Sequence, residues 1–471
     1  MSTIQKLVQM IDQAVKDLED VCMKDGLTVP DLSESFTLES EAFRENPAAF
    51  EATNIAVAAA LQLVAHLMPP TTSLAHAACG HYKSACLRIC AESNIAEILR
   101  ESGSQGLHLD SIAKQSGIER NKLSLVLRYL ATHNIFREVI PDVFTHTRIS
   151  SVMDTGKSLK ELQASPDTKH DNTLGLAALV EYVVDEVAKS SAYGYETIKD
   201  PITGPSREPH HTPLNRAFGT TLPTYDWYEL PENAYRLRRF GAAMKGMSAL
   251  QPSDVILGAY DWSSLEKGAL VVDVGGGIGT STLALYNAFP QFKYIVQDRP
   301  PIITQAIEAC KKENPKALES GCVKFQVHDF FMPQQQSATV FLLKLILHDY
   351  SDANAFKILS ALRMAATPST ILLSIDSLMA YACHVPDSHV AVPGATAPEA
   401  PAPLLANWGP VADNSYIPDL TMFFAVGGQE RTLGHAKSLL EKSGWKLIRV
   451  NRGEGNFTPT LVAKPIQDYK L

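Results

Sequence analysis

The chain has 471 residues, which is enough for two or three domains. Hydrophobic residues make up 45% of the sequence and charged residues 20%, so a sizeable buried core is possible. The net charge of −9 argues against nucleic acid as the main partner, because binding to phosphates requires a basic surface.

The N-terminal residues 1–16 mix charged and apolar residues at helical spacing, without the apolar stretch and cleavage site of a signal peptide. The most apolar stretch, residues 54–68, is shorter than the roughly 20 residues that a membrane span requires. Pro69 and Pro70 end it. We therefore expect a buried helix here, no membrane partner and a cytoplasmic protein.

Residues 82–101 are predicted to form a further helix, and residues 107–136 carry a helix-turn-helix pattern. Gly117 supplies the turn between two short segments whose apolar residues recur at helical spacing. The following stretch, residues 136–150, alternates apolar and polar residues around a Pro-Asp pair and predicts a β-hairpin. Together these elements predict a winged helix.

A winged helix has two interpretations. It binds DNA if its second helix enters a groove, or it serves as a packing and dimerisation module. The second helix offers only Lys122 and Arg128 as cations, among several leucines. This composition favours the dimerisation module.

The stretches 173–190 and 214–250 are predicted to be helical, with a proline-rich loop between them. From Gly268 onward, strand-like and helical patterns alternate, which predicts a doubly wound α/β sheet. The strand-like runs are 269–274, 293–297, 321–327, 338–343 and 370–376, and helical patterns at 279–289, 301–313, 353–366 and 432–443 separate most of them. Residues 380–411 interrupt this pattern with an Ala/Pro-rich insert, which predicts an extended surface loop or lid with Trp408 near its end.

The strongest local signal is an apolar strand that ends in Asp273 and runs into a glycine-rich turn opening a helix. Gly275, Gly277 and Gly279 let the backbone approach a ligand, and the helix N-terminus offers N–H groups to a carboxylate. A dinucleotide fold prefers Gly-x-Gly-x-x-Gly, whereas this spacing suits S-adenosylmethionine, which has no pyrophosphate. Asp298 ends the next strand, where an acid can bind ribose hydroxyls.

His348 follows the strand-like run 338–343 at the edge of the sheet where ligands bind, and Asp376 ends the next strand. A phenol with a pKa near 10 is a poor nucleophile at neutral pH, and a histidine can remove its proton. The alternatives are a structural histidine, or a metal site formed by His348, Asp349 and Asp352. The seven cysteines are scattered and form no zinc pattern.

Several motifs occur in an order that resembles a known family: VVDVGGGIGTST, VQDRPPII, VHDFF, FLLKLILHDYSD, ILLSID and GGQERT. Over roughly residues 55–465 the chain resembles the class I, metal-independent O-methyltransferases with an N-terminal winged-helix dimerisation domain, especially the fungal members. The resemblance implies a Rossmann-like catalytic domain with a doubly wound, seven-stranded sheet, S-adenosyl-L-methionine as cofactor and a homodimer. It divides the chain into an N-terminal extension (1–50), a dimerisation domain (51–165), a helical bridging region (166–250) and a catalytic domain (251–471).

The resemblance also implies roles for single residues. His348 matches the general base, with Asp376 and Glu430 as the acids that orient it. Asp376 stands where the plant enzymes carry a glutamate, so its shorter side chain puts its support of the histidine in doubt. The expected cofactor-binding residues are Asp273, Gly275, Gly277 and Gly279 at the methionine part, Asp298 at the ribose, Asp329 and Phe330 at the adenine, and Lys344 near the cofactor.

A flat apolar pocket would favour a small aromatic acceptor. The candidates to line it are Phe218, Trp227, Met244, Met247, Met422 and Phe423, although each alone is equally well explained by core packing. Two other functions stay open at this point. One is an enzyme with this fold that catalyses a rearrangement or cycloaddition without methyl transfer, and the other is a winged-helix regulator that senses a small molecule.

Overall fold

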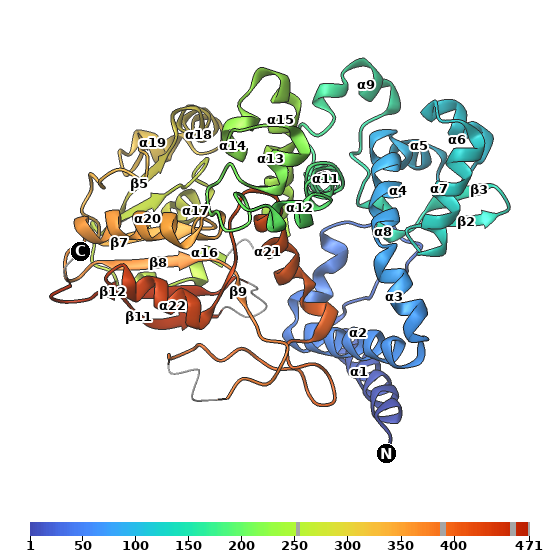
Figure 1. Ribbon diagram of the computed structural model, residues 1–471, viewed down its shortest axis with the longest axis horizontal. Coiled ribbons are helices and arrows are strands. Elements are labelled where there is room, and N and C mark those ends of the chain that lie inside the picture. Colours follow the sequence, from blue (N-terminus) through green and yellow to red (C-terminus); the bar gives the residue numbers. More distant parts are fainter. Residues whose placement is uncertain (251–254, 387–391, 453–457, 470–471) are drawn as a thin grey trace. The chain divides into compact units, whose positions relative to one another are not determined.

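The computed structural model describes residues 1–250, 255–386, 392–452 and 458–469 (Figure 1). The chain forms two compact units, each with its own core. Unit 1 contains residues 1–205 and 210–251, and unit 2 contains residues 206–209 and 252–471. The finer division of the first 250 residues into extension, dimerisation domain and bridging region stays a prediction.

Unit 1 is mainly helical. In chain order its elements are α1 (Thr3–Asp25), η1 (Glu39–Glu45), α2 (Pro47–Leu67), α3 (Pro70–Ala78), α4 (His81–Glu92), α5 (Ile95–Ser102), β1 (Leu107–His108), α6 (Leu109–Ser116), α7 (Arg120–Thr132), β2 (Phe136–Ile140), β3 (Val143–His146), α8 (Arg148–Ser151), α9 (Leu159–Ala164), η2 (Pro166–Thr168), α10 (Leu176–Tyr182), η3 (Val183–Val187), α11 (Ala188–Ser191), α12 (Gly194–Lys199), α13 (Pro213–Phe218), α14 (Thr224–Tyr228), η4 (Pro231–Asn233) and α15 (Ala234–Ala249).

The predicted winged helix is confirmed. Helices α6 and α7 are joined at Gly117, which adopts a left-handed conformation (φ 73°), and β2 and β3 form the antiparallel hairpin. Strand β1 adds to β3 as a third strand. Arg128 on α7 forms ion pairs with Glu138 and Asp142, and Arg120 at the start of α7 pairs with Asp110 and Asp142. Two of the three Lys and Arg side chains on that helix are therefore neutralised within the unit.

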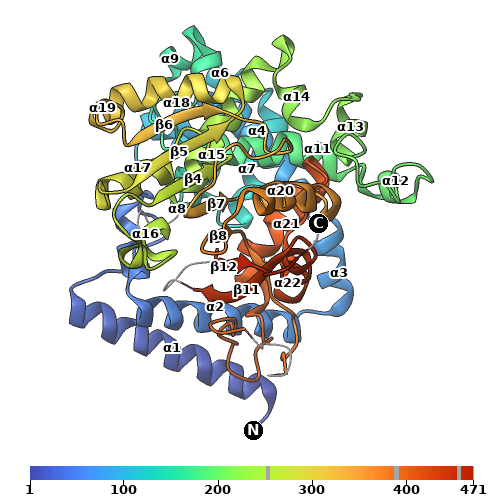
Figure 2. The same cartoon turned by 90° about the vertical axis from the view of Figure 1, so that its left-hand side faces the viewer.

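Helix α2 differs from its predicted character as a buried helix. It lies beside α1 (Figures 1 and 2), and it faces inward with small residues such as Ala52 and Ala59. Its larger apolar side chains remain exposed, with Val64 50% and Leu67 61% accessible. By length and composition this helix could cross a membrane, and only 28% of its most apolar window is buried. The prediction failed because apolar composition does not show whether a neighbouring element covers the helix.

Other predicted helices of unit 1 are interrupted. The stretch 82–101 forms two helices because Asn94 adopts a left-handed conformation between them. The stretch 173–190 contains a π-helical turn, η3, and 214–250 is divided into three helices by Gly219 and prolines.

The π-helical turn carries a buried ionic cluster. Asp185 and Glu186 project from η3 toward α15, where the side chain of Arg239 is 1% exposed. The Arg239 guanidinium lies 2.8 Å from Asp185 and 2.7 Å from Glu186, and Arg236 pairs with the same two carboxylates. Burial of these charges is tolerated only because each is paired. The cluster therefore fastens α15 to the rest of unit 1.

Unit 2 is an α/β unit. Its elements are α16 (Val255–Gly258), η5 (Trp262–Ser264), β4 (Leu270–Val274), α17 (Thr280–Ala288), β5 (Lys293–Asp298), α18 (Pro300–Glu313), α19 (Pro315–Glu319), β6 (Val323–Val327), β7 (Val340–Lys344), η6 (Leu347–Asp349), α20 (Asp352–Ala365), β8 (Ile371–Ile375), β9 (Leu378–Met379), η8 (Gly409–Ala412), α21 (Asp413–Ala425), β10 (Arg431–Thr432), α22 (Leu433–Lys442), β11 (Trp445–Asn451) and β12 (Thr460–Pro465).

The seven-stranded sheet has the order β11-β12-β8-β7-β4-β5-β6. All pairs from β8 to β6 are parallel, and β12 runs antiparallel to both of its neighbours. The predicted doubly wound sheet and its five strand-like runs are confirmed. The connections reverse direction between β4 and β7, and ligands of such sheets bind at this switch point, beyond the carboxyl ends of the strands.

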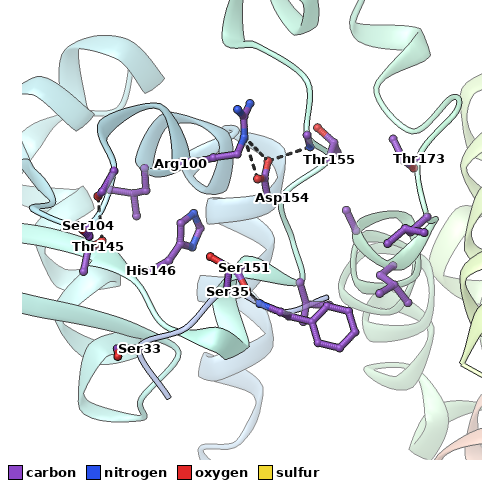
Figure 3. A pocket seen from close by; sticks show the side chains of 18 of the residues that line it. Ser33, Ser35, Arg100, Ser104, Thr145, His146, Ser151, Asp154, Thr155 and Thr173 are labelled. Atoms are coloured by element: carbon purple, nitrogen blue, oxygen red, sulfur yellow. Dashed lines mark hydrogen bonds and ion pairs between the residues drawn. The ribbon is translucent and has the colours of Figure 1, made fainter. Parts of the chain in front are cut away.

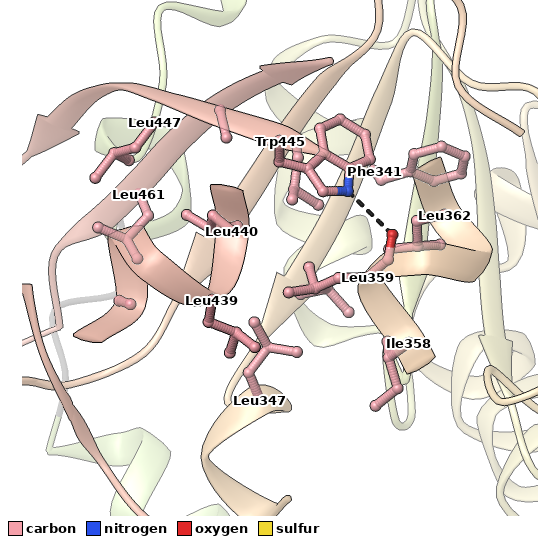
Figure 4. Packing of buried hydrophobic residues seen from close by; sticks show 14 of the residues in the cluster. Phe341, Leu347, Ile358, Leu359, Leu362, Leu439, Leu440, Trp445, Leu447 and Leu461 are labelled. Atoms are coloured by element: carbon pink, nitrogen blue, oxygen red, sulfur yellow. Dashed lines mark hydrogen bonds between the residues drawn. The ribbon is translucent and has the colours of Figure 1, made fainter. Parts of the chain in front are cut away.

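Both faces of the sheet are covered, because successive side chains of each strand point to opposite faces. Val272 and Phe341 pack with α20 and α22, whereas Val271 and Val340 pack with α16, α17 and α18. On the first face the indole of Trp445 donates a 3.0 Å hydrogen bond to the Leu359 carbonyl (Figure 4). These two layers fix the strand ends that carry the candidate site.

The Ala/Pro-rich insert is partly built into unit 2. Val392 and Ala395 are buried in the core, and the Val450 amide of β11 donates to the Pro393 carbonyl at 2.9 Å. The Trp408 indole donates to the Pro398 carbonyl at 3.1 Å, within the insert itself. Residues 387–391 of the insert lie outside the described residues, and a role as a lid stays a prediction.

Candidate active site

The glycine-rich turn joins β4 to α17 at the carboxyl edge of the sheet. Gly275, Gly277 and Gly279 all have positive φ values of 71°, 59° and 85°. A Cβ atom at Gly275 would lie 2.5 Å from Ile346, whereas one at Gly277 would meet nothing within 4 Å. A side chain at Gly275 would require a strained backbone and a shift of the Ile346 side chain, whereas Gly277 presents its backbone to open space where a ligand can approach.

Asp273 and Lys344 lie at the ends of the neighbouring strands β4 and β7. Asp273 is fully buried and accepts a 2.8 Å hydrogen bond from the Thr282 hydroxyl. Burial raises the pKa of Asp273 to about 6, against the opposing effects of Thr282 and Lys344. Burial also lowers the pKa of Lys344, and the charge of Asp273 opposes that change. The two side chains thus form an electrostatically coupled pair below the turn.

Asp298 ends β5, the strand beside β4. Its Oδ2 accepts a hydrogen bond from Gly277 N at 2.9 Å, and its Oδ1 accepts one from Arg299 N at 2.7 Å. Asp329 and Phe330 follow β6, the next strand, and Asp329 is exposed. The structure therefore brings the predicted cofactor residues into one row along the ends of β7, β4, β5 and β6.

This row fits S-adenosylmethionine. Each carboxylate oxygen of Asp298 has a second lone pair for a ribose hydroxyl, and the Gly277 backbone is open on its ligand side. The partly exposed ring of Phe330 offers an apolar face for an adenine. The turn lacks the Gly-x-Gly-x-x-Gly spacing that a dinucleotide pyrophosphate prefers, because Thr280 stands at its last position.

His348 lies in η6, just after β7, with 12% of its side chain exposed. Its Nδ1 lies 2.7 Å from Glu430 Oε1, so Nδ1 carries a proton and donates it to the carboxylate. Its Nε2 lies 3.6 Å from Asp349 Oδ1. Burial disfavours the charged ring, but Asp349, Glu430 and Asp376 outweigh it and raise the pKa of His348 to about 10.

Asp376 supports His348 only at longer range. Its Oδ2 accepts a 2.7 Å hydrogen bond from the Ser374 hydroxyl, and its charge favours the protonated histidine. Within the described part of the chain, Asp376 Oδ1 and Glu430 Oε2 are buried without a hydrogen-bond partner. The direct hydrogen bond therefore comes from Glu430, and the shorter Asp376 acts through its charge.

The segment before β10 is folded tightly onto η6. A Cβ atom at Gly428 would lie 2.0 Å from the His348 carbonyl, so no other residue fits there without displacing the histidine. Gln429 N donates to that carbonyl at 2.8 Å. Arg431 is buried and donates to the carbonyls of Leu347 and Tyr350. These contacts explain why a glycine-rich GGQERT motif accompanies the histidine.

Two further features of the site were not predicted from the sequence. Leu345 has a positive φ of 55°, a strained conformation for a leucine, and it turns the chain from β7 into η6. Asp349 supplies the second acid near the imidazole. The sequence suggested Asp349 only as a ligand of an alternative metal site. The FLLKLILHDYSD motif contains both residues, but it does not reveal their geometry.

A cavity of about 20 Å³ lies on the core side of His348, lined by Asp376, Glu430 and leucines of α22. It has room for a water molecule but not for an acceptor. A larger cavity, about 490 Å³, lies in unit 1 and contains none of the predicted site residues (Figure 3). Its polar lining groups are engaged locally, since Arg100 pairs with Asp154 and both ring nitrogens of His146 are hydrogen-bonded.

The predicted acceptor residues are distributed over both units. In unit 1, the rings of Phe218 and Trp227 lie 4.7 Å apart, and Trp227 is 5% exposed. Met244 and Met247 are half-buried on α15. In unit 2, Met422 and Phe423 are half-buried on α21, just before the GGQERT segment. Their role in an acceptor pocket stays a prediction.

The switch point has a glycine turn suited to a ligand on one side and a histidine supported by carboxylates on the other. This arrangement is typical of a group-transfer enzyme of the doubly wound α/β class. Comparison with known proteins identifies the family. An O-methyltransferase domain matches residues 195–392, and an O-methyltransferase dimerisation domain matches residues 75–155. The first match ends before Glu430, so the role of that residue rests on the geometry above.

The 4-O-methyltransferase 1 of Phanerochaete chrysosporium is 43% identical to the chain over 98% of this chain and 99% of its own length. Mitomycin 7-O-methyltransferase MmcR shares the fold with a TM-score of 0.62 at 22% identity, covering 84% of this chain and 97% of its own. A protein described as a pericyclic reaction enzyme has a TM-score of 0.65 at 18% identity, covering 98% of this chain and all of its own.

The chain belongs to the O-methyltransferase family with an N-terminal dimerisation domain, and its cofactor is S-adenosylmethionine. The predicted family, fold class and cofactor are confirmed. The winged helix is part of the dimerisation domain, which supports a homodimer.

Proposed function

We propose that this protein transfers a methyl group from S-adenosylmethionine to a hydroxyl of a small aromatic molecule, with His348 as the general base. The observation that carries the proposal is the 2.7 Å contact between His348 Nδ1 and Glu430 Oε1. In the neutral ring this contact keeps the proton on Nδ1 and leaves Nε2 to accept a proton from an acceptor. Glu430 and Asp349 then stabilise the imidazolium that forms.

The cofactor supplies an activated, electrophilic methyl group on its sulfonium. His348 Nε2 would take the proton of the acceptor hydroxyl, which would make the acceptor oxygen a stronger nucleophile toward that methyl group. Asp298 and the glycine turn would hold the ribose and methionine parts, with Asp329 and Phe330 at the adenine. The protein's own contribution is then a positioned base and an oriented acceptor.

The electrostatics of His348 support an acceptor as acidic as a phenol. A phenol has a pKa near 10, and the three surrounding carboxylates raise the pKa of His348 to about 10 as well. The carboxylates that stabilise the imidazolium therefore also favour proton transfer from a phenol to His348. An alkyl alcohol is a much weaker acid, so the same histidine would remove its proton far less readily.

A decisive experiment incubates the protein with labelled S-adenosylmethionine and a panel of phenols, and it measures labelled product and S-adenosylhomocysteine. Wild-type protein should methylate at least one phenol. His348→Ala should abolish transfer while cofactor affinity stays within about twofold, because the hydrogen bond of His348 goes to Glu430 and not to a residue of the cofactor row. His435→Ala, a half-buried histidine on α22 that pairs with Asp352, is the matched control and should retain activity. Full activity in His348→Ala would exclude the base assignment.

A second candidate is a rearrangement or cycloaddition with bound cofactor but without methyl transfer. The observation in its favour is the shared fold of the pericyclic reaction enzyme, although the likeness is of fold alone. Cofactor binding with no turnover of any phenol would favour this candidate. The base and its two close acids favour methyl transfer.

We further propose that the protein acts as a cytoplasmic homodimer on a small aromatic acceptor, and not on nucleic acid or a membrane. The exposed apolar side chains of α2 and α3, Val57, Leu61, Val64, Leu67 and Leu74, support a surface that a second copy covers. Sedimentation of the wild type and of Leu61→Asp tests this. A dimer that the substitution dissociates is expected, whereas a wild-type monomer that binds lipid vesicles would contradict it.

A further inference from the structure

Helix α21 connects the Ala/Pro-rich insert to the segment that carries Glu430. Its residue Asp419 accepts a 2.8 Å hydrogen bond from the backbone N–H of Glu430. Asp419 is half-buried and lies eleven residues before Glu430 in the chain. A carboxylate that accepts from a backbone amide makes a strong, directional contact. Asp419 therefore fixes the backbone at the residue whose side chain holds the histidine.

The neighbouring residues of Glu430 are fixed as well. Gln429 N donates to the His348 carbonyl, and Arg431 pairs with Leu378 where β10 runs parallel to β9. The Asp419 contact thus fixes the backbone at Glu430 itself, between the fixed residues Gln429 and Arg431. Three successive residues are held by three different elements, η6, α21 and β9.

Tyr416 fixes α21 in turn. Its hydroxyl donates to the Ala380 carbonyl at 2.7 Å and accepts from Asn407 Nδ2 at 2.9 Å. Tyr416 and Asp419 are three residues apart, so they project from the same face of the helix. Ala380 directly follows β9, which itself follows Asp376 and β8.

These contacts close a ring. From β9, the chain reaches Ala380, whose carbonyl binds Tyr416 on α21. Asp419 on the same helix binds the Glu430 amide, and β10, which follows Glu430, pairs with β9 again. Asp376 lies just before β9 in the chain. Two of the three acids that act on His348, Asp376 and Glu430, belong to this ring. Movement of α21 would shift Glu430 relative to both His348 and Asp376.

We propose that Asp419 is a positioning residue for methyl transfer, which holds the Glu430 backbone so that the Glu430 carboxylate stays in contact with His348, and that Tyr416 braces α21 for this purpose. The inference rests on the proposed role of His348 as the base. Misplacement of a catalytic group by about 1 Å costs on the order of 100-fold in rate, so loss of one backbone anchor should be visible in kcat.

The charge of Asp419 and its hydrogen bond have separable effects. Glu430 faces His348, Asp376 and Asp419, and burial together with the two aspartates raises the pKa of Glu430, while His348 lowers it. His348 in turn faces Asp349 from η6, Glu430 and Asp376. Asparagine at position 419 keeps the acceptor oxygen and removes the charge, whereas alanine removes both.

The test compares Asp419→Ala, Asp419→Asn and the control Asp413→Asn, an exposed aspartate in the first turn of the same helix. Steady-state kinetics measure kcat and the KM for the cofactor, and NMR titration measures the pKa of His348, whose signal is assigned by its loss in His348→Ala. Asp419→Ala should lower kcat about 10- to 100-fold, leave the cofactor KM within about twofold, and lower the pKa of His348 by about one. Asp419→Asn and Asp413→Asn should stay within about threefold of wild type.

Tyr416→Phe keeps the aromatic side chain and removes both hydrogen bonds of the hydroxyl. It therefore tests whether Tyr416 holds α21 in place, even if Asp419→Ala fails to fold. It should lower kcat about three- to tenfold with an unchanged cofactor KM. Wild-type behaviour of Asp419→Ala, or an Asp419→Asn variant as impaired as Asp419→Ala, would overturn the proposal. If the wild type methylates no phenol, the proposed function fails, but the titration of His348 still tests the contact. A lower pKa of His348 in Asp419→Ala, with no such change in Asp419→Asn or Asp413→Asn, would sustain the role of Asp419 in positioning Glu430. An unchanged pKa of His348 in Asp419→Ala would overturn it.

Discussion

The Glu430→Gln substitution tests the electrostatics of the base most directly. The ordinary pKa of histidine is 6.5, and in this site it is about 10, which corresponds to about 5 kcal/mol in favour of the imidazolium. A hydrogen bond to a charged partner contributes about 1.5–3 kcal/mol of this. Loss of the Glu430 charge should therefore lower the pKa of His348 by about one to two.

The direction of the effect on the rate follows from the protonation state. The neutral imidazole is the active base, so kcat rises with pH through the pKa of His348. Bound S-adenosylmethionine carries a positive charge, which should place this midpoint below 10 in the wild-type complex. In Glu430→Gln the midpoint should move a further one to two pH units downward. The limiting rate should fall about 100-fold, because glutamine can donate to Nδ1 and leave the proton on Nε2.

The assay follows labelled methyl transfer at saturating cofactor and phenol between about pH 5.5 and 9.5. Glu441→Gln, an exposed glutamate on α22, serves as the control and should keep the wild-type profile. A midpoint that does not move in Glu430→Gln, or that moves to higher pH, would show that this carboxylate does not govern the base.

Three other substitutions probe the cofactor site, unit 1 and the GGQERT segment. Asp298→Ala should raise the Kd of S-adenosylmethionine about tenfold or more in calorimetry, since about 1 kcal/mol is lost for each ribose hydrogen bond; an unchanged Kd would remove this residue from the ribose site. Arg239→Met should reduce the unfolding free energy of unit 1 by about 3 kcal/mol in denaturant titrations, because the buried Asp185 and Glu186 lose the more deeply buried of their two arginine partners, whereas the exposed Arg238→Met should cost less than about 1 kcal/mol. Equal losses in the two arginine variants would contradict this reasoning. Gly428→Ala should lower kcat at least about 100-fold by displacing His348, while Gly434→Ala, with no atom within 4 Å of the new methyl group, should be active; normal kinetics of Gly428→Ala would refute the packing argument.

The centre of the parallel part of the sheet could be predicted from the sequence because β4, β7 and β8 are mostly apolar runs buried on both faces. Strands β11 and β12 were not predicted. In β11 the exposed Lys446 and Arg449 interrupt the apolar residues, and the segment pairs with a strand that the sequence places after it. The prediction of α2 as a buried helix was wrong for a different reason. Its composition is that of a core helix, but in the described part of the chain it packs mainly against α1, and its larger apolar side chains stay exposed.

The candidate site divides in the same way. Local motifs predicted the glycine turn, Asp298 and His348, because each follows directly from a strand end. The partner of His348 comes from 82 residues further along the chain, and only the resemblance to a family suggested Glu430. Asp419 and Leu345 carry no sequence signal of their own, since one acts through a backbone amide and the other through a strained φ value.

The contact of the insert with β11 has a consequence for solubility and for protein engineering. β11 is the outermost strand of the seven-stranded sheet, and its unpaired backbone groups would otherwise offer a template for strand addition by another molecule. Part of that template is occupied by residues 392–395 of the insert. The Gly394 backbone lies so close to β11 that a Cβ atom at Gly394 would be 2.1 Å from the Val450 carbonyl oxygen. A shortened chain that lacks the whole insert should therefore aggregate, whereas one that keeps residues 392–395 should tolerate changes in the exposed stretch that follows.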